Sequence, residues 1–133
     1  MPTLTDELLR RLGDAMARDP ELKVIGKFFN ARFLLQAENR RYLLIVRDGQ
    51  LQNVLADPPV VEEWSFAIKA PDSTWEKFLE SPPRPMFHDI WAATWMGDMT
   101  LEGDTKVLMQ QHNAVWRTLE LLRELASGVT ISA

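Results

Sequence analysis

Two histidines, His88 and His112, are the side chains of this sequence best suited to acid–base chemistry near neutral pH. A general base also needs a nucleophile or an orienting carboxylate nearby, and the sequence indicates neither. His88 precedes Asp89 at the predicted start of a helix, where capping explains both residues. His112 shares a predicted helical face with Leu108 and Val115, which is typical of a structural histidine or of a polar group inside a ligand pocket. An enzyme that uses His112 with an acid is one alternative.

The acidic residues show no arrangement that favours hydrolysis by two carboxylates. They stand at predicted turns, helix caps and outward strand positions, where capping and solvation explain them. These residues are Glu62, Glu63, Asp72, Glu76, Asp98, Glu102 and Asp104. The histidines and acids match no metal-ligand spacing, and the absence of cysteine excludes thiol nucleophiles and thiolate metal sites. The sequence also lacks the phosphate-loop and nucleophile-elbow motifs. We therefore expect no enzyme, no metal and no cofactor.

Aromatic and methionine side chains are the more informative group. Such residues at helical spacing usually just pack in a core, but they also suit the wall of an apolar cavity, because methionine adapts to varied ligands. The sequence holds five tryptophans, more than a core of this size needs, which favours the cavity. We predict that the ligand-binding residues are Phe66, Phe78, Phe87, Trp91, Trp95, Met99, Leu101, Met109, His112 and Trp116.

Hydrophobic periodicity predicts the elements that must position these residues. Residues 3–18 form an amphipathic helix, which Asp19-Pro20 ends because a residue before proline avoids the helical region. Apolar runs at 33–37, 42–46, 51–55 and 64–69 predict strands. Asp48-Gly49 is typical of a type I′ hairpin. In the predicted strand at 64–69, alternation places Trp64, Phe66 and Ile68 on one face.

The second half of the chain returns to helices. Pro71-Asp72-Ser73 opens a short helix whose inner side carries Trp75, Phe78 and Leu79. After a proline-rich connector, Phe87, Trp91 and Trp95 fall on one helical stripe. At Gly97 the period changes to two, so that Met99 and Leu101 share one face of a short strand. The final helix spans about 105–126 and carries a buried stripe of Leu108, Val115, Leu119 and Leu122, widened by Met109 and Trp116.

Length and composition complete the sequence-based prediction. The 133 residues fit one domain, 1–133, of the α+β class: a mainly antiparallel sheet of about five strands, with helices packed on one face. The net charge of −4 argues against binding of nucleic acid. No apolar run is long enough to span a bilayer and no signal peptide is visible, so we expect no integral membrane association and a cytoplasmic protein.

The order of elements and the motif at 97–104 resemble the sterol carrier protein 2 family. The signature of that family is glycine, two alternating apolar residues and a second glycine followed by Asp or Asn, and it leads into a helix. Here it stands as Gly97-Asp-Met-Thr-Leu-Glu-Gly-Asp104. A strand that leads into an acidic helix start, followed by a linker and an apolar helix, matches in kind over about residues 64–122.

The resemblance implies a mixed sheet-and-helix fold around an apolar tunnel. It also implies a protein that binds or carries a fatty acid, an acyl-CoA, a sterol or a similar lipid, and does no chemistry on it. The alternative is a structural or interaction module whose tunnel is filled. Such a module would act as a homodimer or as the partner of a lipid-metabolising enzyme. The sequence leaves monomer and homodimer open.

Overall fold

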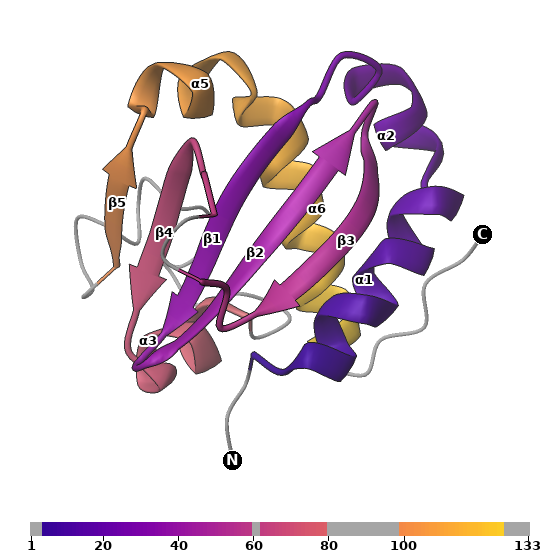
Figure 1. The fold of residues 1–133 in the computed structure, drawn as a ribbon. Helices are drawn as coiled ribbons and strands as arrows, with labels where there is room; N and C mark the ends of the chain where they lie inside the picture. Colours follow the sequence, from indigo (N-terminus) through magenta and orange to yellow (C-terminus); the bar gives the residue numbers. More distant parts are fainter. Residues whose placement is uncertain (1–3, 60–61, 80–98, 127–133) are drawn as a thin grey trace.

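The protein folds into one sheet and one layer of helices (Figure 1). This computed structural model describes residues 4–59, 62–79 and 99–126. The strands are β1 (Ala31–Ala37), β2 (Arg40–Arg47), β3 (Gln50–Ala56), β4 (Phe66–Ala70) and β5 (Thr100–Gly103). They lie in the order β3-β2-β1-β4-β5, and β1 and β4 run parallel while the other pairs are antiparallel. The predicted α+β class is confirmed, with one parallel pair in the sheet.

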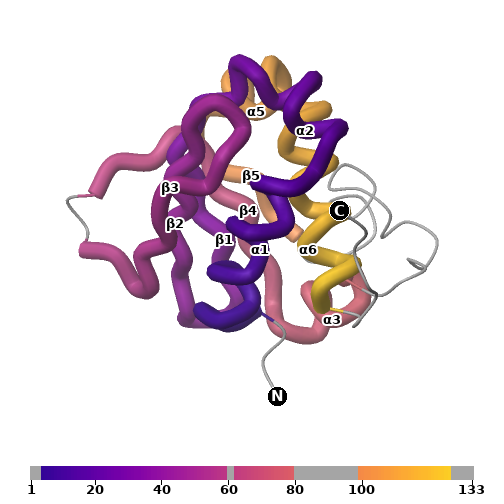
Figure 2. Tube along the Cα trace, turned by 90° about the vertical axis from the view of Figure 1, so that its right-hand side faces the viewer, coloured from indigo at the N-terminus to yellow at the C-terminus, as the bar shows by residue number. Residues whose placement is uncertain are grey.

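The described helices are α1 (Asp6–Arg18), α2 (Pro20–Ile25), α3 (Asp72–Phe78), α5 (Thr105–Gln110) and α6 (His112–Ala126). In the side view of Figure 2 the helices lie on one side of the sheet, and α1 and α6 are next to each other. Helices therefore cover one face of the sheet, as predicted. None of the helices within the described residues has the length and apolar character that a bilayer crossing needs.

The amino end of the helical layer is fixed by two helix caps. The Thr5 side chain accepts a hydrogen bond from Leu8 N at 3.1 Å and begins α1. Asp19 ends α1 and at once caps α2, since its carboxylate accepts from Leu22 N at 3.0 Å and Pro20 occupies the first turn. Helix α2 is absent from the sequence-based prediction, which uses Asp19-Pro20 only as the end of a helix. The same dipeptide also begins one, with Asp as the cap and Pro in the first turn.

The predicted hairpin between β2 and β3 is confirmed in detail. Asp48 and Gly49 have φ angles of 52° and 76°, the positive values that a type I′ turn requires. Gly49 also packs against the loop after α2: a Cβ at this position would lie 2.7 Å from the Gly26 carbonyl oxygen. The hairpin tip and the α2–β1 connection thus support each other through direct backbone contact.

A second, smaller apolar cluster covers the outer face of the sheet. Leu34, Leu43 and Ala67 are buried there, and Trp64 packs on them from the β3–β4 connection. The Arg32 side chain holds this connection by donating to the Glu63 carbonyl oxygen at 2.9 Å, as well as to the Glu62 carboxylate. The prediction that Trp64 shares a face with Phe66 and Ile68 was wrong. The strand begins only at Phe66, so the two-residue alternation does not extend back to Trp64.

The last helical region consists of two helices, where the sequence predicted one. Gln111, with φ −106° and ψ 14°, interrupts the helix between α5 and α6, and its side chain donates to the Phe28 carbonyl oxygen at 3.4 Å. Figure 1 shows α5 crossing one end of the molecule and α6 running behind the sheet. The stripe of Leu108, Val115, Leu119 and Leu122 is buried, as predicted. Met109 and Trp116, however, do not widen it, because they are 67% and 38% exposed.

Candidate functional site

A row of aromatic rings lies on the inner face of the sheet. Phe33 on β1 and Phe66 on β4 are register partners, and their rings stack with centroids 5.0 Å apart and planes 7° apart. Phe29 continues the row, with its ring centroid 6.3 Å from that of Phe33. All three side chains are fully buried. The face of the sheet under the helices is therefore a flat aromatic surface. These side chains carry no polar group that needs a hydrogen-bond partner.

Helix α3 closes one end of this surface. Trp75 is fully buried and its Nε1–H donates to the Gln36 carbonyl oxygen at 2.8 Å. The Phe78 ring meets the Trp75 ring edge-on, with centroids 5.8 Å apart. The guanidinium of Arg123 lies 5.1 Å from the Phe78 centroid, and its Nε donates to the Phe78 carbonyl oxygen at 2.9 Å. A buried cation thus borders the apolar interior beside Phe78.

Four of the predicted ligand-binding residues belong to this interior. Phe66, Phe78 and Met99 are buried members of the main core, and Leu101 is half-buried and packed against it. They come from β4, α3, the residue before β5, and β5 itself. The structure therefore brings together residues that are up to 35 positions apart (Phe66 to Leu101) in one apolar core.

The other predicted residues are placed differently. His112 is half-buried at the first position of α6. The side chains of Met109 and Trp116 reach the surface. Phe87, Trp91 and Trp95 lie outside the described residues, as do Gly97 and Asp98, the first two residues of the 97–104 motif. For these three aromatic residues, the role in a cavity stays a prediction.

Phe29 and Phe33 were not predicted as members of the aromatic row. The alternation of Phe33 with Leu35 and Ala37 was a usable signal, since all three side chains are buried in the same core. What the sequence could not supply was the parallel pairing of β1 with β4, which sets Phe33 opposite Phe66. Only that pairing turns two separate phenylalanines into a continuous surface.

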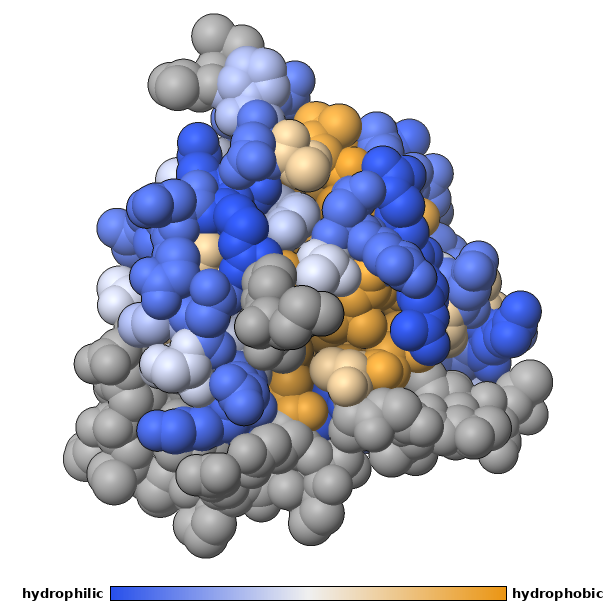
Figure 3. Space-filling view, turned by 90° about the horizontal axis from the view of Figure 1, so that it is seen from below, coloured by the Kyte–Doolittle hydropathy of each residue, from blue (hydrophilic) through white to orange (hydrophobic). Residues whose placement is uncertain are grey.

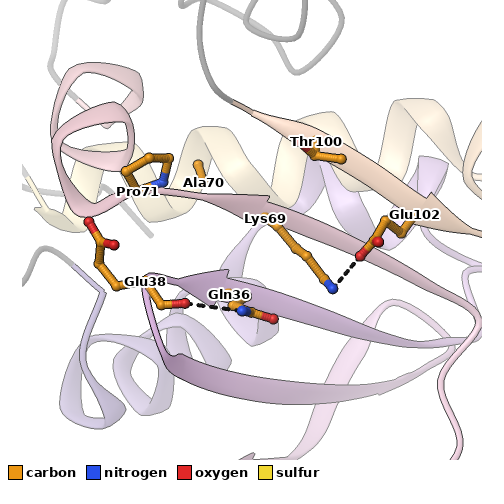
Figure 4. Close-up of a pocket in the computed structure, with 7 residues that line it drawn as sticks. All are labelled: Gln36, Glu38, Lys69, Ala70, Pro71, Thr100 and Glu102. Carbon is orange, nitrogen blue, oxygen red and sulfur yellow. Dashed lines mark hydrogen bonds and ion pairs between the residues drawn. The ribbon is translucent and has the colours of Figure 1, made fainter.

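Three open hollows on the outside of the described residues have mixed polar and apolar linings and lie away from this interior. One of about 360 Å³ lies over β1, β4 and β5 and is lined by Gln36, Glu38, Lys69, Ala70, Pro71, Thr100 and Glu102. Figure 4 shows Lys69 paired with Glu102 across the hollow, and Gln36 bonded to Glu38. Lys69 and Glu102 are thus paired with each other, and the Glu38 carboxylate accepts a hydrogen bond from Asp72 N at 3.1 Å. Two further hollows lie beside β3, on residues 10–17 with 50–54 and on residues 30–32 with 45–47. None of the three includes a predicted ligand-binding residue.

Apolar side chains are visible between polar ones at one end of the molecule (Figure 3). Seen from below, apolar side chains form a band between polar regions on either side (Figure 3). At this end Leu4 is buried, and its carbonyl oxygen accepts hydrogen bonds from Arg40 Nη1 at 2.6 Å and from the Tyr42 hydroxyl at 3.4 Å. The Leu4 carbonyl oxygen is therefore satisfied by side chains of β2.

The described residues offer little for metal or acid–base chemistry. Across residues 4–59, 62–79 and 99–126, no three histidine, aspartate or glutamate side chains gather closely enough to hold a metal ion. Among the described residues, Asp19 and Arg117 have clearly shifted pKa values. The Arg117 guanidinium bonded to Asp19 holds the pKa of that carboxyl below its ordinary value, although burial opposes the shift, and the same bond raises the pKa of Arg117. Asp19 joins the α1–α2 junction to α6 and lies outside the aromatic interior. We therefore assign its pKa shift to a structural role.

The comparison with solved structures identifies the architecture. No protein-family model and no curated protein sequence matches this chain. A crystal structure of sterol carrier protein 2 superposes with a TM-score of 0.71 at 17% identity, and covers 90% of this chain and 96% of that chain. The chain has the sterol carrier protein 2 fold.

Two further structures with the sterol carrier protein 2 fold are similar to this chain over most of their length. A protein from Thermus thermophilus, described as a candidate sterol carrier protein, has a TM-score of 0.68 at 18% identity, covering 95% of this chain and 91% of that one. The UbiJ-SCP2 ubiquinone synthesis protein has a TM-score of 0.61 at 16% identity and covers 89% of both chains. The resemblance inferred from the sequence is therefore confirmed at the level of the fold.

Proposed function

We propose that this protein binds an apolar ligand, such as a fatty acid, an acyl-CoA or a sterol, and carries it without altering it. The observation that carries the proposal is the fold shared with sterol carrier protein 2 over nine-tenths of the chain. The interior supports it, because the stacked Phe33 and Phe66 rings and the methionine before β5 are side chains of the kind that line ligand cavities.

In this proposal the ligand lies between the inner face of the sheet and the helices. Phe66, Phe78, Met99 and Leu101 would line the space on the described side, together with Phe33, which was not among the predicted residues. Phe87, Trp91, Trp95 and His112 are proposed as further contacts. We leave out Met109 and Trp116, because their side chains reach the surface.

The direct test is a displacement titration with NBD-labelled stearate, followed by competition with oleate, oleoyl-CoA and cholesterol. We expect saturable binding and a shift of tryptophan emission, because Trp75 packs edge-on against Phe78, one of the proposed ligand contacts. Failure of all three lipid classes to bind or compete would contradict the proposal.

Two methionines provide a matched pair of variants for the site. Met99 is 3% exposed within the core, whereas Met109 is 67% exposed. An amide placed in an apolar wall without a partner costs about 1–3 kcal/mol, so Met99→Gln should weaken the binding of labelled stearate about tenfold. Met109→Gln should leave the affinity unchanged. Equal affinities of the two variants, with both folded by circular dichroism, would place the ligand elsewhere.

The cellular setting and assembly state stay predictions. We propose that the protein acts in the cytoplasm, on a lipid rather than on nucleic acid, as a monomer or a homodimer. Cell fractionation and sedimentation velocity of the purified protein test these two points separately.

A further inference from the structure

The two edge strands of the sheet differ in length and charge. Within the described residues, β3 lies at one end of the strand order and β5 at the other (Figure 1). Strand β5 has four residues, one of them Glu102, whereas β3 has seven, with no charged residue and no proline. Charged side chains, proline and short length are features that keep an edge strand from pairing with another chain. Strand β3 has none of these three.

A bulge divides β3 into two parts. The register with β2 passes over Gln52, which is the extra residue of the bulge. Because a bulge bends the strand and increases its twist, residues 50–52 are poorly shaped for pairing with a further strand. Residues 53–56 pair with β2 in unbroken register. These four residues are the regular part of the edge.

Hydrogen bonds show which backbone groups of this regular part point away from β2. Asp57 N donates to the Arg41 carbonyl oxygen on β2 at 2.6 Å, so the Asp57 backbone faces β2. Because this direction alternates along a strand, the backbone groups of Val54 and Ala56 face the open side. Val54 N agrees with this assignment, since it donates to the side-chain oxygen of Asn53, on its own strand, at 2.9 Å.

The side chains of the regular part leave the edge accessible. Asn53 and Ala56 are exposed and Leu55 is half-buried. Helix α1 packs against β3, but the open hollow of about 470 Å³ on residues 10–17 and 50–54 lies between them. The helix therefore does not cover this edge of the sheet.

We propose that two copies of this chain pair through β3, antiparallel and about a two-fold axis, so that their sheets become one. A two-fold contact sets the edge against itself, and no like charges meet because β3 carries none. Self-pairing of β5 would instead bring the Glu102 residues of both copies together. In the pair, a carbonyl oxygen of the second copy replaces Asn53 as the acceptor of Val54 N, so Asn53 competes with the second copy. The inference goes beyond the proposed function, which leaves monomer and homodimer open, and requires no bound ligand.

The test is sedimentation velocity of the purified, ligand-free protein from micromolar to millimolar concentration. We expect a reversible equilibrium of monomer and dimer in this range, because a short strand contact makes a small interface. Ala56→Lys should weaken dimerisation by at least about tenfold, since it sets two like charges close to each other at the contact. Asn53→Ala should strengthen dimerisation by at least about fivefold, because it removes the competing acceptor of Val54 N in each copy. Hydrogen exchange of the Val54 and Ala56 amides should slow as the concentration rises.

Thr100→Lys is the matched control, because Thr100 is exposed on the other edge strand and gains the same charge. It should dimerise like the wild type. A wild type that stays monomeric at millimolar concentration, or an Asn53→Ala variant that dimerises no more tightly, would overturn the proposal. So would Ala56→Lys protein that dimerises like the wild type while folded by circular dichroism. Equal losses in Ala56→Lys and Thr100→Lys would overturn it in favour of a general effect of charge. Because no ligand is present, these outcomes do not bear on the lipid-binding proposal.

Discussion

Asp19 and Arg117 form a two-point ion pair although they are 98 positions apart. Arg117 Nε donates to Asp19 Oδ2 at 3.0 Å, and Arg117 Nη2 donates to Asp19 Oδ1 at 2.7 Å. The same carboxylate caps α2 through Leu22 N. Arg117 also pairs with Glu120 on its own helix. One nearly buried carboxylate thus joins the α1–α2 junction to α6, in the bidentate geometry that makes such pairs strong.

Loss of this pair should destabilise the protein more than loss of an exposed acid. Asp19→Ala leaves Arg117 partly buried with fewer acceptors and removes the cap of α2, so we expect the free energy of unfolding to fall by about 3–4 kcal/mol. Urea denaturation followed by circular dichroism measures it. Asp14→Ala, at an exposed position of α1, should change stability by less than about 0.5 kcal/mol. Similar effects of both substitutions would contradict this account.

The ion pair also predicts a direction for the pH dependence of stability. The hydrogen bonds from Arg117 hold the pKa of Asp19 below its ordinary value of 3.8, and the pKa of Arg117 is raised by the same bonds. A lowered folded-state pKa means that the stabilisation is fully present above 3.8 and is lost as the pH falls through the lowered value. Urea denaturation between about pH 7 and pH 2 should therefore show the wild type approaching Asp19→Asn only at the acid end. A constant gap between the two proteins would show that Asp19 does not titrate in this way.

Two glycines predict opposite responses to the same substitution. Gly103 at the end of β5 has a φ of 89°, and a Cβ there would lie 2.6 Å from the Ser65 carbonyl oxygen and 2.7 Å from the Trp64 ring. Gly103→Ala should therefore cost about 2–4 kcal/mol, through strain and steric overlap. Gly13 lies within α1, and a Cβ there would lie 3.5 Å from the Leu51 side chain, an ordinary contact. Gly13→Ala should be neutral or stabilise by up to about 1 kcal/mol. Thermal unfolding of both variants separates these results; equal shifts would refute the difference.

Neighbouring residues of α5 should differ sharply on truncation. Leu108 is fully buried in the main core, whereas Met109 is largely exposed. We expect Leu108→Ala to lower the free energy of unfolding by about 2–5 kcal/mol and Met109→Ala to change it by less than about 0.5 kcal/mol. Equilibrium urea denaturation of both proteins is the measurement. A large effect at Met109 would mean that its side chain is covered in solution.

Replacement of Trp75 by phenylalanine tests the junction of α3 with β1. The variant loses the hydrogen bond to the Gln36 carbonyl oxygen and part of a fully buried ring, so we expect a loss of about 2–3 kcal/mol. Tryptophan emission should also lose a blue-shifted component, because Trp75 has no contact with solvent. Unchanged stability would indicate that the Gln36 carbonyl finds another donor.

The sequence predicts those features that depend on residues close to each other along the chain. The Thr5 cap, the Asp48-Gly49 turn and the inner side of α3 depend on residues within one or two turns of each other. The same is true of the buried stripe on α6, which its own helical period sets. The resemblance to a known fold depended on the order of the elements. Each short motif constrains only its own surroundings, whereas the order of the motifs along the chain constrains the topology.

Features that depend on distant parts of the chain could not be predicted. The stacking of Phe33 on Phe66 requires a parallel pairing that no local pattern encodes. The exposure of Met109 and Trp116 depends on which elements pack beside α5 and α6, and the helical period, which places Leu108 and Val115 correctly, does not contain that information. For the candidate site, burial of Phe66, Phe78 and Met99 is confirmed, whereas their contact with a ligand stays a proposal.

The place of β4 beside β1 has a consequence during translation. The meander β1–β2–β3 can pair as soon as Ala56 is made, but α6, which covers much of its inner face, is complete only at Ala126, a further 126 − 56 = 70 residues. At about 5–20 residues per second, the ribosome takes roughly 4–14 s over that distance. Until β4 is made, the inner face with Phe33 and Leu44 has no β4 beside it. Until α6 is complete, the same face has no α6 above it. For seconds the nascent chain therefore holds an apolar sheet that only α1 and α2 can cover, the condition under which ribosome-associated chaperones act.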